Sequence, residues 1–79
     1  MTRAETLKWI GQIFEESADQ ITPATARDEI AAWDSLGTLA LLAGLDQEFG
    51  ILVSDRDIQA IKTVNDILEV LKKNSKLSD

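Results

Sequence analysis

A strongly apolar stretch between Asp34 and Gly50 constrains the fold more than any other part of this sequence. Asp34 is a favourable helix N-cap, and Gly50 suits the left-handed position that ends many helices, so the stretch predicts a helix over residues 35–49. Its apolar side chains cover well over half of the circumference, too much for a helix with a single buried stripe. The helix is therefore central and packed on several neighbours, or it leaves part of its apolar surface open for a partner. These apolar residues are Leu36, Leu39, Ala40, Leu41, Leu42, Ala43, Leu45 and Phe49.

The residues before this stretch predict an amphipathic helix and a long connection. Thr2 and Glu5 have the spacing of a capping box, and apolar residues then recur at intervals of three and four, which predicts a helix over residues 3–18. The connection over residues 19–33 is long for a compact domain, and a short helical turn is expected within residues 24–31. Its expected anchors in the core are Ile21, Ile30 and Trp33.

Two further helices are predicted after Gly50. Ser54 and Thr63 are each followed three residues later by an aspartate, as in a capping box, and they open predicted helices over residues 55–61 and 64–74. The apolar run over residues 51–53 is too isolated to pair as a strand and is expected to be a buried linker.

These elements predict an all-α fold, a four-helix bundle with a long first loop and a short third helix. A chain of 79 residues forms a single domain, residues 1–79, with an ordered core over about residues 3–73 and a polar tail, residues 74–79, that frays. The predicted core consists of Leu7, Ile10, Phe14, Leu39, Leu42, Phe49, Ile61, Val64, Ile67, Leu68 and Leu71.

The composition argues against several classes of function. The chain has no histidine, cysteine or tyrosine, so Ser-His-Asp and Cys-His catalysis and disulfides are impossible, and no catalytic residue is expected. A net charge of −6 argues against a nucleic-acid partner, because phosphate binding requires clustered Lys and Arg. No apolar run approaches the ~20 residues of a membrane span, and the N-terminus lacks the apolar segment of a signal peptide. We therefore expect no membrane insertion and a cytoplasmic location.

Ser35 occupies the first position of the predicted central helix, directly after the cap residue Asp34. A hydroxyl there tends to point outward, and an anionic group attached to it would lie at the positive end of the helix dipole. The position therefore suits a serine that carries a phosphate ester. From these residues alone, an ordinary serine beside an aspartate cap is the simpler interpretation.

The residues from 34 onward also carry a longer pattern. Asp34-Ser35-Leu36 is followed by the stretch Leu45-Asp46-Gln47-Glu48-Phe49-Gly50-Ile51, and then by Asp55, Asp57 and the helix start Thr63-Val64. In motif and spacing this pattern resembles the acyl carrier protein family. The resemblance extends over about residues 20–73 and, more loosely, over the first helix.

The resemblance implies that Ser35, with Asp34 and Leu36 as its motif, carries covalent 4′-phosphopantetheine, which a phosphopantetheinyl transferase takes from coenzyme A. The thiol of this arm would carry an acyl group as a thioester and present it to partner enzymes. The implied partners are that transferase, an acyl or aminoacyl ligase or transferase, and downstream acyl-using enzymes. The protein would then be a carrier, expected as a monomer, and not an enzyme. The missing histidine and cysteine agree with this, because the prosthetic group and the partners supply the chemistry.

Partner enzymes are expected to recognise the surface near the motif. Fatty-acid carriers usually have acidic residues early in the second helix, where this chain has Gly37 and Ala40, and Arg56 interrupts a region that is often uniformly acidic. With Trp33 before the motif, these departures favour a specialised stand-alone carrier, of a polysaccharide, secondary or D-alanyl pathway, over the housekeeping fatty-acid carrier. The candidate recognition residues are Leu36, Leu39, Ala40, Leu41, Asp46, Glu48, Asp55, Arg56 and Asp57, with Ala40 and Leu41 expected on the outer side of the helix.

Other interpretations stay open. The same arm serves aminoacyl, D-alanyl and peptidyl carriers, and the leucine-rich helix suits either shelter for a long acyl chain or ordinary core packing. An unmodified acidic helical interaction module is the alternative of another class. Asp55-Arg56-Asp57 lacks the glycine and the terminal glutamate of a twelve-residue calcium loop, so no metal site is expected.

Overall fold

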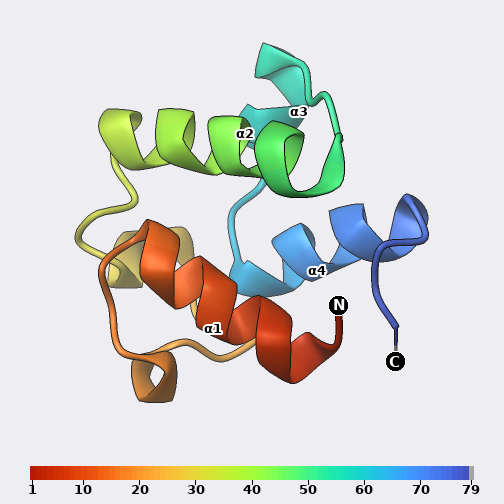
Figure 1. The fold of residues 1–79 in the computed structure, drawn as a ribbon. Coiled ribbons are helices and arrows are strands. Elements are labelled where there is room, and N and C mark those ends of the chain that lie inside the picture. The colour runs from red at the N-terminus through yellow and green to blue at the C-terminus, as the bar shows by residue number, and fades with distance from the viewer. Residues whose placement is uncertain (79) are drawn as a thin grey trace.

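The computed structural model describes residues 1–78 as helices joined by loops (Figure 1). The elements, in order, are α1 (Arg3–Ile13), the 3₁₀-helices η1 (Ala18–Gln20) and η2 (Arg27–Glu29), α2 (Ser35–Phe49), α3 (Asp55–Ala60) and α4 (Val64–Lys73). No strand forms within the described residues, where an isolated bridge joins Ala26 to Thr63. The predicted all-α fold, with its long first loop and short third helix, is confirmed. No helix in the described part of the chain is long and apolar enough to span a membrane.

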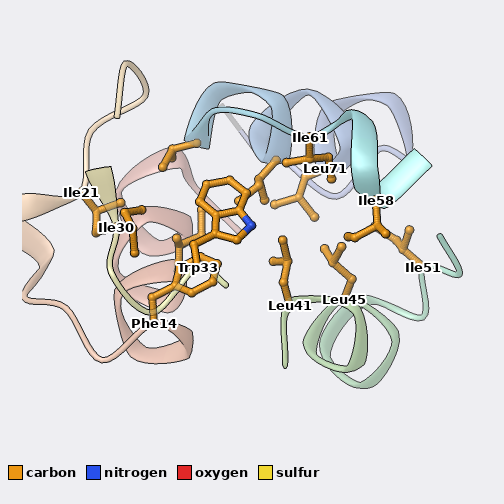
Figure 2. Close-up of a cluster of buried hydrophobic side chains, with 13 residues drawn as sticks. Phe14, Ile21, Ile30, Trp33, Leu41, Leu45, Ile51, Ile58, Ile61 and Leu71 are labelled. Carbon is orange, nitrogen blue, oxygen red and sulfur yellow. The ribbon is translucent and has the colours of Figure 1, made fainter. Parts of the chain in front are cut away.

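Helix α2 begins and ends where its caps predict. The Asp34 Oδ1 atom accepts a hydrogen bond from the Gly37 N–H at 3.0 Å, and Gly50 adopts the left-handed conformation with a φ of 67°. Leu41 and Leu45 project from α2 into the core, toward Ile61 and Leu71 (Figure 2). α2 therefore buries one narrow stripe of its apolar surface and leaves other leucines exposed.

Helix α1 is shorter than predicted, because it ends at Ile13 and not at residue 18. Glu15 takes a left-handed conformation with a φ of 56°, and the Glu16 N–H donates to the Gly11 carbonyl at 2.8 Å. This turn closes the helix immediately after Phe14. The Phe14 ring stacks on Trp33, with ring centroids 5.0 Å apart and planes 22° from parallel.

The long first connection is held in place at its middle. The Arg27 N–H donates to the Lys62 carbonyl at 2.7 Å, and the Val64 N–H donates to the Thr25 carbonyl at 2.9 Å. The connection thus pairs with the segment between α3 and α4, and the predicted helical turn within residues 24–31 is η2. Its three predicted anchors, all of them buried, are Ile21, Ile30 and Trp33.

Most of the residues predicted to be buried are buried, with three differences. Leu39 is 60% exposed, so its assignment to the core is wrong, and Leu41 and Leu45 are the fully buried leucines of α2. Leu52 is 84% exposed, so only part of the linker over residues 51–53 is buried. The residues that pack at the edge of the core, only partly buried, are Leu7, Leu42 and Phe49.

The two ends of the described chain lie close together (Figure 1). The N-terminal ammonium donates to the Lys76 carbonyl at 3.1 Å and to Ser78 Oγ at 2.9 Å, and Leu77 packs partly buried against the core. Asp79, the last residue of the tail predicted to fray, lies outside the described residues.

Candidate functional site

Ser35 is exposed at the first position of α2, and the two residues before it hold it there. Trp33 is only 5% exposed and packs on Phe14, which anchors the chain immediately before the helix. Asp34 then caps the helix, with its carboxylate bound to the Gly37 N–H and its carbonyl bound to the Thr38 N–H at 2.8 Å. Ser35 is therefore held at an exposed position that another protein can reach.

A surface pocket of about 330 Å³ adjoins Ser35, between η2, α2 and α3. Arg27 is a lining residue, and its Nη2 atom donates to Thr38 Oγ1 at 3.1 Å. Polar and apolar groups share this lining, which consists of Arg27, Ser35, Thr38, Leu39, Leu42, Asp55, Ile58 and Gln59.

Several residues of this pocket were not among the sequence candidates. Arg27 lies in an irregular stretch with no periodicity, and Gln59 lies on a short helix whose orientation the sequence does not specify. Thr38 belongs to the predicted central helix, but its partner comes from η2. Only the folded arrangement brings these side chains to Ser35.

The expected partner surface divides into separate regions. Leu36 is exposed at the motif, and Leu39 and Asp55 line the pocket with Ser35. Asp46 and Glu48 are exposed on the last turns of α2, roughly 16–20 Å from Ser35 along the helix axis at 1.5 Å per residue. The further exposed candidates are Ala40 on α2 and Arg56 and Asp57 on the first turn of α3.

Leu41 does not belong to this surface. Its side chain is 0% exposed, so the expectation that it lies on the outer side of α2 is wrong. Its side chain points into the core, where residues of α1, α3 and α4 surround it (Figure 2). A partner enzyme cannot contact Leu41 in the folded protein.

The site fits a covalently attached phosphodiester. The oxygen that would carry it is exposed at a helix N-terminus, where the dipole favours an anion, and a guanidinium lines the adjoining pocket. Ser35 would hold the group, and Arg27 is the cation of the pocket lining. Within residues 1–78, no three acidic side chains gather as they would around a metal ion.

Comparison with protein families agrees with this geometry. The family model described as "phosphopantetheine attachment site" matches residues 8–71, which include Ser35 and all of α2 and α3. Domains of this family hold 4′-phosphopantetheine covalently, act as carriers and have no catalytic site of their own. Since the match covers most of the chain, the protein belongs to the family of phosphopantetheine-bearing carrier domains that includes the acyl carrier proteins.

Proposed function

We propose that this protein carries acyl groups as thioesters on a 4′-phosphopantetheine arm attached to Ser35. The observation that carries the proposal is the exposed serine at the start of α2, inside a family match that spans residues 8–71. The arm supplies the thiol that this chain lacks, since the sequence has no cysteine.

Attachment would require a phosphopantetheinyl transferase. Ser35 Oγ forms the new bond to the phosphorus of the pantetheine-bearing phosphate, the pyrophosphate bond of coenzyme A breaks, and 3′,5′-ADP leaves. The serine proton passes to a base of the transferase, because this chain has no histidine to accept it. Asp34 and Leu36 flank the reacting oxygen and form the motif that the transferase would recognise.

The pocket beside Ser35 favours a second candidate for the cargo, an aminoacyl, D-alanyl or peptidyl group. Leu41 and Leu45 are fully buried in a packed core, and the adjoining pocket has a mixed lining that includes Arg27 and Gln59. Such a lining suits a short or polar cargo better than a long alkyl chain. A short or polar cargo would agree with a specialised carrier that has its own activating ligase.

Partner enzymes would approach the exposed side of α2 that faces away from the core. Leu36 and Leu39 offer apolar contacts beside the arm, and Asp55 and Arg56 add charges of both signs on α3. A mixed surface of this kind supports recognition by dedicated partners. The monomeric state and the cytoplasmic location stay predictions from the sequence.

Intact-mass measurement after incubation with coenzyme A and a broad-specificity phosphopantetheinyl transferase tests the proposal. We expect a gain of one phosphopantetheinyl group, no gain in Ser35→Ala, and an unchanged gain in Ser17→Ala, which removes another exposed serine. No mass gain in the wild-type protein would contradict the carrier function and favour an unmodified interaction module. Loading of the product by acyl-activating or by aminoacyl-activating ligases then separates the two cargo classes.

A further inference from the structure

Two acidic side chains near Ser35 oppose the favourable effect of the α2 dipole on an added negative charge. Asp34 is the adjacent residue and caps α2, Asp55 lines the same pocket as Ser35, and the whole chain has a net charge of −6. A phosphodiester on Ser35 would add a further negative charge at this place. Like charges at close range oppose each other, even after screening by water and salt.

Arg27 is the cation that the fold brings to this pocket. Its backbone is held by the 2.7 Å hydrogen bond to the Lys62 carbonyl, and its guanidinium by the 3.1 Å hydrogen bond to Thr38 Oγ1. Thr38 lies three residues after Ser35 on α2, and side chains at this spacing are neighbours on a helix surface, with Cβ atoms about 5–6 Å apart. The guanidinium is thus tethered about one helical turn from the attachment oxygen.

The contact with Thr38 orients Arg27 without neutralising it. A threonine hydroxyl is uncharged and occupies one of the five N–H donors of the guanidinium, which leaves others for an anion. Arginine binds phosphate oxygens through parallel charge-assisted hydrogen bonds.

We propose that Arg27 is a positioning residue for the prosthetic group: it pairs with the phosphodiester on Ser35 and holds the base of the arm over the pocket between η2, α2 and α3. This inference rests on the proposed function, because it requires that Ser35 is loaded. If the proposal holds, removing the Arg27 charge destabilises the loaded protein more than the unloaded protein. We call this difference the coupling between Arg27 and the loading of Ser35.

Thermal unfolding of the unloaded and loaded proteins measures this coupling. Intact mass is checked first, to establish that Ser35 carries the arm in each variant. We expect Arg27→Gln to lower the Tm of the loaded protein by about 2–5 °C more than it lowers the Tm of the unloaded protein. The ³¹P resonance of the phosphodiester should also shift in the same variant. It is measured well below the Tm, where a general loss of stability would leave this resonance in place. At 1 M salt, where the Debye length is about 3 Å, the additional loss should shrink.

Arg56→Gln is the matched control, since it removes the same charge from an exposed arginine that does not line this pocket. It should lower the Tm of both forms equally and leave the ³¹P resonance in place, whereas Arg27→Lys should retain part of the coupling. Equal effects of Arg27→Gln on the loaded and unloaded proteins, with an unmoved ³¹P signal, would overturn the role of Arg27 and leave the carrier function intact. Failure of Ser35 to load would overturn both.

Discussion

Gly37, in the first turn of α2, lies directly against the carbonyl oxygen of Ala32 in the preceding loop. A Cβ atom at Gly37 would overlap that oxygen and would lie 3.3 Å from Phe14 Cε1. The loop can therefore fold back onto the start of α2 only because residue 37 has no side chain. This close approach fixes the helix end that presents Ser35.

Gly37→Ala is accordingly expected to destabilise the protein. The overlap involves a backbone atom that cannot rotate away, so the free energy of unfolding should fall by about 1–3 kcal/mol, as in other overpacked sites. Urea unfolding followed by circular dichroism measures the change.

Gly44→Ala is the control for the preceding variant, since it adds the same methyl group to the same helix. Its Cβ would meet Ile13 Cδ1 at 3.0 Å and Trp9 Cζ2 at 3.1 Å, both in side chains, of which the isoleucine end can rotate aside. Alanine also gains up to about 1 kcal/mol of helix propensity over glycine. The loss in free energy of unfolding should therefore be clearly smaller for Gly44→Ala than for Gly37→Ala. An equal loss would show that the contact between Gly37 and the Ala32 carbonyl does not limit the size of residue 37.

Two leucines of α2 should respond very differently to truncation. Leu41→Ala empties a fully buried site and should lower the free energy of unfolding by about 2–5 kcal/mol. Leu39 is 60% exposed, so Leu39→Ala should change the free energy of unfolding by about 0.5 kcal/mol or less. Comparable losses in the two variants, measured by urea unfolding, would mean that α2 is rotated relative to the structure described above.

The cap of α2 should contribute to stability through its acceptor oxygen and not through its charge. Asp34→Ala removes the acceptor for the Gly37 N–H and should cost about 0.5–2 kcal/mol, whereas Asp34→Asn keeps an acceptor and should cost little. Thermal unfolding of both unloaded variants compares them. If Asn destabilises as much as Ala, the carboxylate charge at the helix dipole is the larger effect.

A pH dependence of stability is expected from Glu5. The Thr2 N–H donates to its carboxylate at 2.9 Å, and this hydrogen bond lowers the pKa of Glu5 below its ordinary value. Because the pKa of Glu5 is lower in the folded than in the unfolded protein, ionised Glu5 stabilises the fold above the unfolded-state pKa of about 4.3. This stabilisation is lost as the pH falls through the folded-state pKa.

Glu5→Gln should therefore flatten part of the decline in Tm between neutral pH and pH 3. Glu48→Gln, which removes an exposed glutamate near the end of α2, serves as the comparison. If both variants have the same acid profile as the wild-type protein, the Thr2–Glu5 capping box does not contribute to acid sensitivity.

Local signals predicted the helix starts well. Thr2, Asp34, Ser54 and Thr63 each cap the helix that follows, because a capping hydrogen bond joins residues only three positions apart. The end of α1 was predicted five residues too late. The left-handed Glu15 that stops the helix is not a residue type that favours this conformation, and the turn brings the chain around Phe14 as it packs on Trp33.

The orientation of α2 shows why periodicity alone was insufficient. Apolar residues surround most of this helix, so the pattern does not distinguish the stripe with Leu41 and Leu45 from the stripe with Leu36 and Leu39. The positions of α1, α3 and α4 around α2 determine which stripe is buried. As a result, Leu39 lies on the surface and Leu41 is buried.

The sequence by itself determined that Ser35 begins a capped helix, that the chain lacks histidine and cysteine, and that its motif is that of a carrier family. Only the tertiary structure decided what surrounds that serine. Arg27 reaches Thr38 because the long connection pairs with the segment before α4, and Asp55 reaches the same pocket from α3. Local patterns describe residues a few positions apart, whereas these contacts depend on how separate elements pack against one core.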